Sequence, residues 1–166
     1  MSPVARRNPE QLDLLMRQLG RDLALDYAGP GGMWEDADLV VEPSPNRWPS
    51  RKDLAVASGV DAAAQTLVNR LKTQRGELAS LGHPDYGSRH HELIGEPNVE
   101  RTRNLVKLHV LEALTHEPRV EKVLSVQVTA PHDPPRSDVR IELDLQLVGE
   151  PAPLNLVVPF SFGVES

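Results

Sequence analysis

The chain has no cysteine, few aromatic residues and no long apolar run, and each absence excludes a class of protein. Without cysteine it has no disulfides, thiolate metal ligands or cysteine nucleophile, a composition typical of assembly inside a cell. No window approaches the roughly 20 apolar residues that span a bilayer, so we expect no direct membrane insertion. The formal net charge of −6 argues against nucleic acid as a partner, because no basic excess is available to neutralise phosphates.

The remaining composition is that of a globular protein. Hydrophobic residues make up 39% and charged residues 25% of 166 residues, enough for one domain with a core but cramped for two full domains. The 15 prolines and 11 glycines indicate long irregular connections. We find no internal repeat in the sequence.

The N-terminal 52 residues predict one helix and two short strands. Asn8 is suited to cap a helix with Pro9 at its first position, and Gly20 is suited to end it. A stripe at helical spacing is formed by Leu12, Leu15, Met16 and Leu19. Short strands are predicted at residues 22–26 and 38–41, before prolines 43, 45 and 49 interrupt backbone pairing.

Two further helices are predicted in the middle of the chain. Asp61 is suited to cap the first, over residues 61–73, and Asn98 the second. The second helix has the longest amphipathic face, formed by Thr102, Leu105, Val106, His109, Val110, Ala113 and Leu114. Pro118 must end it, because proline has no amide donor and pushes the preceding residue out of the helical region.

After Arg119 the apolar period changes from helical to two, which predicts strands. Leu124, Val126 and Val128 alternate with polar residues, and residues 139–147 alternate more regularly still. A third strand is predicted at residues 154–160. Three sequential strands with short links indicate an antiparallel meander, so the fold class is α+β, with helices packed on a small C-terminal sheet.

The search for catalytic and metal-binding patterns is mostly negative. The six histidines contain no His-Glu-x-x-His spacing, and no Gly-x-Ser-x-Gly turn is present. Adjacent His90 and His91 are expected to point in different directions, and His109 is expected to be a neutral, hydrogen-bonded core residue. We therefore predict no metal and no cofactor. Glu77 and Asp85, both in loops, leave paired-carboxylate glycoside hydrolysis open as an alternative.

The segment from Asp53 to Phe160 resembles the baseplate-wedge, sheath-initiator family of contractile injection systems, which includes phage tails and type VI secretion machines. The matching residues occur in the family's order along this segment. They are Asp53-Leu54, Ser58-Gly59, Leu71, Thr73, Gly76-Glu77, Pro84 to Gly87, Leu93, Asn98, Ala113-Leu114, Glu117 to Arg119, Asn155 to Val157 and Pro159-Phe160. We accordingly divide the chain into an N-terminal extension, residues 1–52, and a baseplate-wedge domain, residues 53–166.

The resemblance implies a structural protein without enzyme activity. It implies a baseplate component, assembled in the cytoplasm into a phage tail-like particle, that templates the first layer of sheath around the tail tube. The implied partners are sheath protein, tail tube protein and other baseplate wedge proteins, with six copies in a ring. Some members of the family carry a "lysozyme-like" label, so a peptidoglycan hydrolase using Glu77 and Asp85 stays an alternative, as does a free protein-binding adaptor.

Two groups of residues are predicted to bind partners. The resemblance implies that Glu117, Pro118 and Arg119 contact the core bundle of the wedge; without it, a helix stop with a local ion pair is the alternative. If Pro118 keeps the backbone extended, the carboxylate and the guanidinium project to the same side. The second group is a strand that, if it lies at the sheet edge, could exchange a strand with sheath through its unpaired amides and carbonyls. This strand comprises Leu154, Asn155, Leu156, Val157 and Val158. The alternative is an ordinary edge strand blunted by proline.

Overall fold

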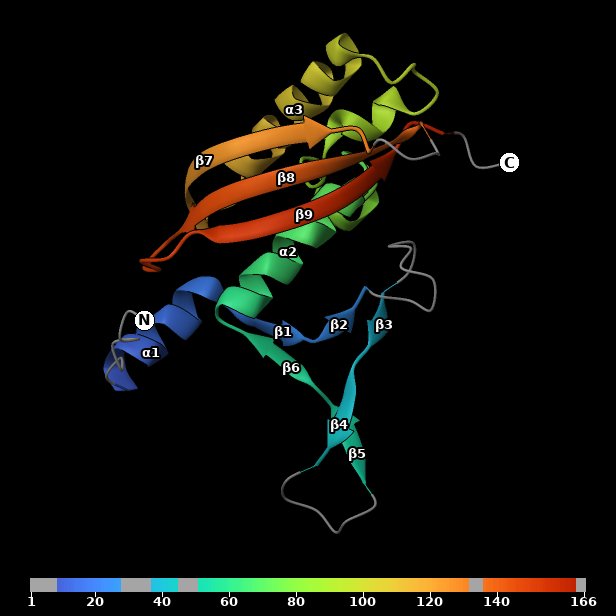
Figure 1. The fold of residues 1–166 in the computed structure, drawn as a ribbon. Coiled ribbons are helices and arrows are strands. Elements are labelled where there is room, and N and C mark those ends of the chain that lie inside the picture. The colour runs from blue at the N-terminus through green and yellow to red at the C-terminus, as the bar shows by residue number, and fades with distance from the viewer. Residues whose placement is uncertain (1–8, 28–36, 45–50, 132–135, 164–166) are drawn as a thin grey trace. The chain divides into compact units, whose positions relative to one another are not determined.

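The chain forms two compact units, residues 1–65 and residues 66–166. The computed structural model describes residues 9–27, 37–44, 51–131 and 136–163 (Figure 1). Helix α2 (Val60–Lys72) contains the boundary between the units. The division into residues 1–52 and 53–166 made on sequence stays a prediction.

The N-terminal unit begins with helix α1 (Pro9–Leu19), which starts at the predicted proline. Gly20 ends the helix as predicted: its φ is 90°, and its N–H donates to the carbonyl of Met16 at 2.9 Å. A positive φ of this kind costs glycine nothing and other residues about 1–2 kcal/mol. The proposed cap Asn8, and the side chains of Leu12 and Leu15, lie outside the described residues.

Short strands make up the rest of this unit. They are β1 (Arg21–Leu23), β2 (Leu25–Asp26), β3 (Asp38–Leu39), β4 (Val41–Pro43), β5 (Lys52–Leu54) and β6 (Val56–Ser58). The two predicted strands are present, each interrupted at one residue, whereas β5 and β6 were not predicted. Pro43, where a break was predicted, is the last residue of β4 and lies opposite Lys52. Proline is tolerated there because each ribbon has only two strands, so both are edges.

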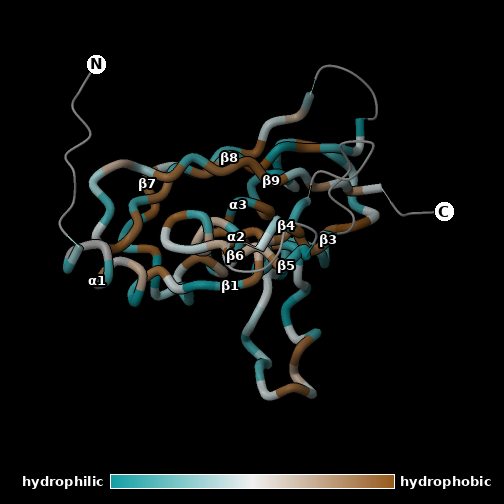
Figure 2. Tube along the Cα trace, turned by 90° about the horizontal axis from the view of Figure 1, so that it is seen from below, coloured by the Kyte–Doolittle hydropathy of each residue, from teal (hydrophilic) through white to brown (hydrophobic). Residues whose placement is uncertain are grey.

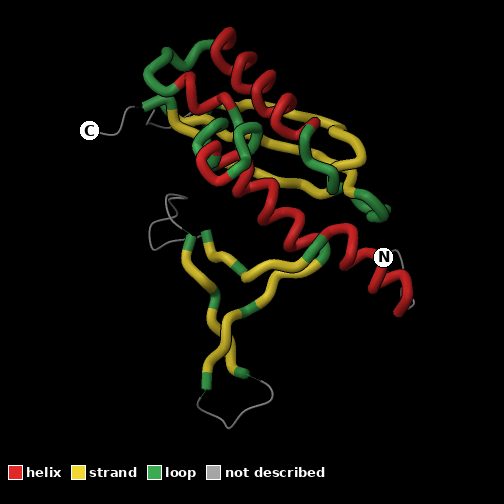
Figure 3. Tube along the Cα trace, turned by 180° about the vertical axis from the view of Figure 1, so that it is seen from behind, coloured by secondary structure: helices red, strands yellow, loops and turns green. Residues whose placement is uncertain are grey.

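Three antiparallel ribbons meet at a three-way junction formed by Ala24, Val40 and Ala55. The ribbons pair β1 with β6, β2 with β3 and β4 with β5, and Figure 3 shows their three-armed arrangement. At the centre Ala24 N–H donates to Ala55 at 2.8 Å, Ala55 N–H to Val40 at 2.9 Å, and Val40 N–H to Ala24 at 3.0 Å. Each junction residue thus donates to one neighbour and accepts from the other, which satisfies the backbone where the ribbons diverge.

The C-terminal unit confirms the predicted α+β class. It contains the second half of α2, helix α3 (Glu100–Thr115), and two short 3-10 helices, η1 (Ala79–Leu81) and η2 (Arg89–Leu93). Its sheet is the predicted meander, with strands β7 (Val120–Thr129), β8 (Asp138–Leu147) and β9 (Leu154–Ser161). All neighbours are antiparallel in the order β7-β8-β9. Helix α3 packs against β7, and it lies on the same side of the sheet as α2 (Figures 1 and 2).

The core of this unit lies between the helices and the inner face of the sheet. Every second residue of β8 is buried, and the polar residues between them face outward, a pattern visible as alternating colours in Figure 2. The buried β8 side chains are Val139, Ile141, Leu143, Leu145 and Leu147. The edge strand β9 contributes Val158 and Phe160, and α3 contributes Val106, Val110 and Leu114.

A register shift in β7 overturns one predicted core position. Val123 is opposite Leu145, but Ser125 is opposite Asp144, so Leu124 is an extra residue without a partner in the ladder. This bulge reverses the alternation, and Leu124 is 49% exposed rather than part of the inner face. Val126 and Val128 keep the predicted inward side, opposite Leu143 and Ile141.

Both predicted caps in the middle of the chain were wrong. Helix α2 begins at Val60, so Asp61 lies in its first turn, and the Gly59 carbonyl accepts from Ala63 N–H at 3.0 Å. Helix α3 is preceded by Val99, which makes no side-chain capping bond.

Asn98 instead reaches across to the loop before β8. Its amide donates to the Arg136 carbonyl at 2.7 Å, and its oxygen accepts from Arg103 at 2.8 Å. Leu105 was predicted on the buried face of α3 but is exposed. Among the described helices, none is long and apolar enough to cross a membrane.

Candidate partner-binding site

The corner between α3 and β7 is a tight turn rather than the predicted extended segment. Helix α3 ends before Pro118, as predicted. The chain then turns so that Val120 N–H donates to the Glu117 carbonyl at 3.1 Å. This turn brings the Arg119 guanidinium back to the Glu117 carboxylate, with Nη1 and Oε1 2.8 Å apart. The two charges therefore pair with each other instead of projecting side by side.

Glu117 is enclosed within the unit. Its side chain is 1% exposed, and Oε2 accepts from Arg70 Nε and Nη2, each at 3.3 Å. Both carboxylate oxygens thus have guanidinium donors, one set from α2 and one from the turn. A buried carboxylate of this kind is tolerated only when it is paired in this way. We conclude that Glu117 holds α2 and the turn together.

Arg70 also contacts Tyr86, and this contact explains part of the Pro84-to-Gly87 motif. The Arg70 guanidinium lies 4.6 Å from the centroid of the Tyr86 ring, a cation–π arrangement. Gly87 has a φ of +99°, and a Cβ there would lie 2.6 Å from the Thr73 carbonyl oxygen. Only glycine allows this close approach, which places Tyr86 beside Arg70.

Arg119 and Pro118 are the parts of the corner that solvent reaches. Pro118 is exposed, and the Arg119 side chain is 30% exposed while it pairs with Glu117. Partner binding by this corner stays a prediction. On that prediction Arg119 would make the contact with the partner, and Glu117, which is buried, would position it. Arg70 was missed on sequence, although its place three residues after Leu67, on the buried side of α2, was a signal.

The second predicted partner-binding segment lies at an edge of the sheet. Strand β9 pairs with β8 on one side only. Leu156 and Val158 are on the inner side, opposite Leu143 and Ile141, whereas Asn155 and Val157 are on the outer side. The condition for strand exchange, that this strand lies at a sheet edge, is therefore met, and β7 forms the opposite edge. Strand exchange at β9 stays a prediction.

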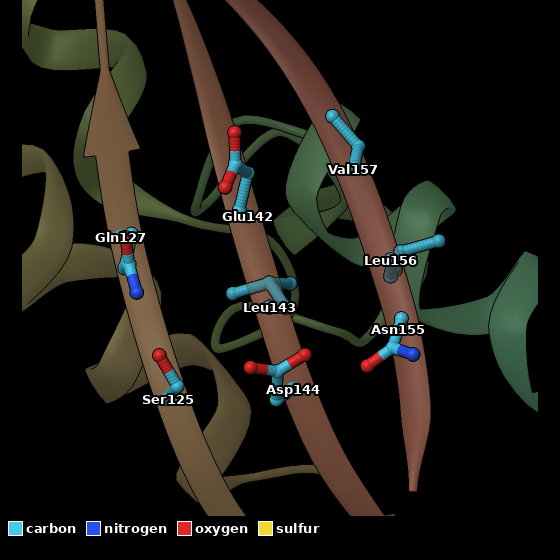
Figure 4. Close-up of a pocket in the computed structure, with 8 residues that line it drawn as sticks. All are labelled: Ser125, Gln127, Glu142, Leu143, Asp144, Asn155, Leu156 and Val157. Carbon is cyan, nitrogen blue, oxygen red and sulfur yellow. The ribbon is translucent and has the colours of Figure 1, made fainter.

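The outer face of the sheet is polar and slightly hollowed. A depression of about 160 Å³ opens there, and Figure 4 shows its lining residues, which come from all three strands. They are Ser125, Gln127, Glu142, Asp144, Asn155 and Val157, together with Leu143 and Leu156, whose side chains lie on the inner side of the sheet. Carboxylates on β8 lie between amide side chains on β7 and β9. A protein that covered this sheet would meet hydrogen-bonding side chains interspersed with apolar surface, since Val157 is also exposed there.

The alternative catalytic pair, Glu77 and Asp85, has local structural roles. Glu77 Oε2 accepts from the backbone N–H of Gln74 at 3.1 Å, which closes the turn at Gly76. Asp85 accepts from Arg75 at 3.0 Å and is 72% exposed. A general acid usually needs a desolvated setting, which an exposed, paired carboxylate lacks. Neither residue lines the depression on the sheet.

The rings of His90 and His91 lie close together, contrary to the prediction that these side chains point in different directions. Their ring centroids are 4.2 Å apart, because η2 brings consecutive side chains near one another. His90 Nδ1 lies 2.8 Å from Ser88 Oγ, and its ring meets the edge of Phe160. Burial lowers the pKa of His90 to about 3, assisted by the nearby His91 and His109. His90 is therefore a neutral core residue.

His109 was expected to be hydrogen-bonded, but its buried Nδ1 makes no hydrogen bond among the described residues. Glu112 Oε2 is 3.8 Å away from this atom, too far for one. Within the described ranges, no group of three or more histidine or acidic side chains is placed to hold a metal ion. His132 lies outside those ranges.

Comparison with known proteins identifies the family to which this chain belongs. The family described as baseplate wedge protein gp25 matches residues 57–152. The chain belongs to this family, whose members are mainly structural parts of baseplates. It is therefore a component of a phage-tail or contractile-injection baseplate that assembles with other baseplate proteins.

A solved structure supports the same assignment. A protein from Geobacter sulfurreducens, named as a candidate tail lysozyme, is 28% identical to this chain. The TM-score is 0.51, and the match covers 59% of this chain and 86% of that one. No curated protein matches the chain.

Proposed function

We propose that this chain templates the first layer of contractile sheath around the tail tube, by offering β9 to a strand of a sheath subunit. The observation that carries the proposal is the position of β9 at a sheet edge whose inner face is already occupied by the core. A strand added there gains backbone hydrogen bonds without disturbing the fold. Six copies in a ring, assembled in the cytoplasm, would start sheath growth around the tube.

The position of Pro159 indicates which residues of β9 receive the added strand. Proline within a sheet normally lies on an edge strand with its missing N–H directed to solvent. The backbone N–H groups of successive residues point to opposite edges of a strand, so the N–H groups of Asn155 and Val157 point away from β8, as the missing N–H of Pro159 would. The partner strand would therefore pair with Asn155 and Val157, and Pro159 would end the pairing.

The corner at Glu117, Pro118 and Arg119 would attach the chain to the core bundle of the baseplate wedge. Arg119 has a planar donor fork that suits carboxylates or carbonyls on a helix bundle. Its pairing with the buried Glu117 holds it in place before binding, which reduces the ordering that binding requires. Sheath templating at β9 and attachment at the corner are compatible, because the corner precedes β7, at the opposite edge of the sheet.

Sheath templating is tested by Val157→Pro, with Val157→Thr as the matched control. The proline removes one outward N–H, whereas threonine keeps it. We expect baseplates that contain the Val157→Pro chain but bear no sheath in electron micrographs, and normal sheaths with Val157→Thr. Full-length sheaths on Val157→Pro particles would refute templating by β9.

Attachment at the corner is tested by Arg119→Ala and Arg119→Lys. Glu117 keeps Arg70 as a partner in both variants, so the isolated chain should unfold at nearly the wild-type temperature. Lysine keeps the charge but not the fork, so both variants should fail to co-sediment with baseplates. Wild-type incorporation of Arg119→Ala would reject the corner as the attachment point.

Cell-wall hydrolysis is the second candidate, and only the name of the Geobacter protein favours it. The test is clearing of cell-wall suspensions by the wild-type chain and by Glu77→Gln. We expect no clearing by either. Clearing that Glu77→Gln abolishes, with particle assembly intact, would establish the hydrolase instead. A free adaptor would fail to co-sediment with sheath and tube.

A further inference from the structure

The strands of the N-terminal unit contain an internal repeat that the sequence analysis missed. Each of three segments has aspartate, leucine, alanine or valine, and then leucine or valine. The segments are residues 22–25, 38–41 and 53–56. Their third residues are the three junction residues, so each repeat passes through the three-way junction at the same position. The repeat escaped notice because it is short and its spacing is uneven.

The repeat places one large aliphatic side chain on either side of each junction residue. Cross-strand partners lie on the same face of a ribbon, as do residues two apart on a strand. The register pairs Leu23 with Val56, Leu25 with Leu39, and Val41 with Leu54. Alternating between a cross-strand partner and the residue two positions away on the same strand leads from Leu23 through all six residues and back to Leu23. All six side chains therefore share one face, which we call the apolar face.

Five of the six side chains of the apolar face are exposed. Leu39, Val41 and Val56 are 47%, 51% and 48% exposed. Leu23 and Leu54 are nearly as exposed, and Leu25 is half-buried. An isolated two-stranded ribbon is marginally stable in water, and aliphatic side chains gathered on one face usually mark an interaction surface.

Backbone groups at the edges of β1, β2 and β5 beside this face already have partners, so its expected mode of binding differs from that of β9. Leu23 N–H donates to Asp22 Oδ1 at 2.8 Å, and Leu54 N–H to Asp53 Oδ1 at 2.9 Å. Gln65 accepts from Leu25 N–H at 2.9 Å and donates to the Leu23 carbonyl at 2.8 Å. With these backbone groups occupied, adding a strand along β1, β2 or β5 is disfavoured, and we expect a partner to contact the side chains of the apolar face.

Charge is divided between the two faces of the ribbons. By the same alternation, the basic residues Arg21 and Lys52 border the apolar face. The opposite face has the junction side chains at its centre and is bordered by carboxylates. These are Asp22, Asp26, Asp38, Glu42 and Asp53, and the same alternation places the basic residue Arg51 beside them. A partner for the apolar face would need an apolar patch with an acidic border to match Arg21 and Lys52.

We propose that the apolar face docks on an aliphatic patch with an acidic border, carried by a different protein of the same tail particle. A second copy is disfavoured in either orientation. Two apolar faces in contact would bring like charges together at their borders, and Ala55, at the centre of the opposite face, is only 7% exposed. An anionic membrane is disfavoured because the described ribbons have five carboxylates against three basic residues and are therefore negatively charged overall. The proposal rests on membership of the baseplate but does not depend on sheath templating.

The test uses the absence of cysteine in the chain, which allows single-cysteine labelling of free chain and of purified particles. Leu39→Cys and Val56→Cys place the label on different ribbons of the apolar face. Asp38→Cys is the matched control, next to Leu39 but on the opposite face. We expect labelling of Leu39→Cys and Val56→Cys to slow by about tenfold or more on assembly, with Asp38→Cys nearly unchanged.

The outcomes separate this proposal from baseplate membership. Co-sedimentation of the variants with particles reports membership, while labelling reports the apolar face. A bifunctional reagent at Leu39→Cys should join the chain to a different particle protein through one of that protein's acidic-bordered patches. Undiminished labelling in particles, a cross-linked homodimer, or flotation of the free chain with anionic phosphatidylserine vesicles would each overturn the proposal.

Discussion

The two units of this chain use apolar residues in opposite ways. In the C-terminal unit the alternating apolar residues of β8 are all buried beneath helices, and even charged residues such as Glu117 and Arg70 are enclosed. In the N-terminal unit five of the six large aliphatic side chains of the apolar face stay exposed, and polar side chains satisfy some of the backbone groups beside them. The first arrangement produces a stable scaffold, and the second leaves its apolar surface available to a partner.

This difference shows that hydrophobic content alone does not indicate where stability lies. A two-stranded ribbon has no second layer, so its aliphatic side chains bury little area within the chain. A three-stranded sheet with helices on one face buries a whole row of side chains. Substitutions in the two units should therefore differ in effect even where the residues are chemically alike.

The largest expected effect is that of Glu117→Ala, which leaves Arg70 buried without its carboxylate. We expect a loss of about 3–5 kcal/mol in the free energy of unfolding of the C-terminal unit, since an unpaired buried charge is strongly destabilising. Denaturant unfolding followed by circular dichroism measures it. The double variant Arg70→Met/Glu117→Leu should recover much of the loss, and no recovery would contradict this explanation.

A leucine-to-alanine pair tests the comparison directly. Leu145→Ala removes a fully buried side chain, and we expect a loss of about 2–5 kcal/mol. Leu39→Ala removes an exposed one, and we expect a change of about 0.5 kcal/mol or less in the free chain. Hydrogen exchange followed by mass spectrometry assigns each effect to its unit. Equal losses would break the distinction between the two units.

Acid should destabilise the C-terminal unit through His90. Its pKa is about 3 in the folded chain and near 6.5 when unfolded, so above pH 6.5 both states are neutral and stability is full. As the pH falls below 6.5 only the unfolded state binds this proton, and stability falls by about 1.4 kcal/mol per pH unit until pH 3.

The control for the acid prediction is His90→Gln, which cannot take up that proton. Between pH 6.5 and 5, its free energy of unfolding should decline less steeply than that of the wild type. Parallel pH profiles for the two chains would show that other groups cause the acid sensitivity.

The smallest expected effect belongs to the N-terminal unit. Asp53→Ala removes the acceptor of Leu54 N–H. It also removes the repulsion between the carboxylates of Glu42 and Asp53, which lie opposite each other in the register. An exposed hydrogen bond and a like-charge pair are each small and oppose one another. We expect a change below about 0.5 kcal/mol, measured by hydrogen exchange at residues 52–58. A loss above about 1 kcal/mol would show that the aspartate is essential to the ribbon.

Much of the C-terminal fold was predictable because its signals are local and strong. The clean alternation of residues 139–147 and the proline after α3 gave the meander and the helix end. The bulge at Leu124 was not predictable, because a register shift depends on the partner strand. Likewise the Asn98 side chain could cap a helix, but it hydrogen-bonds to the loop before β8 instead.

The candidate site was predictable only in part. The sequence located the Glu117–Arg119 corner and the edge strand β9, but not the turn that folds Arg119 back onto Glu117. Arg70 and Tyr86, which complete that cluster, are 47 and 31 residues before Glu117 in the chain, so no local pattern connects them. The three-way junction was missed because β5 and β6 are three residues each, too short for a periodic signal.

The sequence by itself determined the α+β class, the meander and the family, because period, proline placement and ordered motifs depend on near neighbours along the chain. Only the tertiary structure decided that Glu117 is enclosed while Arg119 reaches solvent, and that three short repeats converge on one junction. Burial and strand register depend on which distant segments meet, and that information is not written in any single stretch of residues.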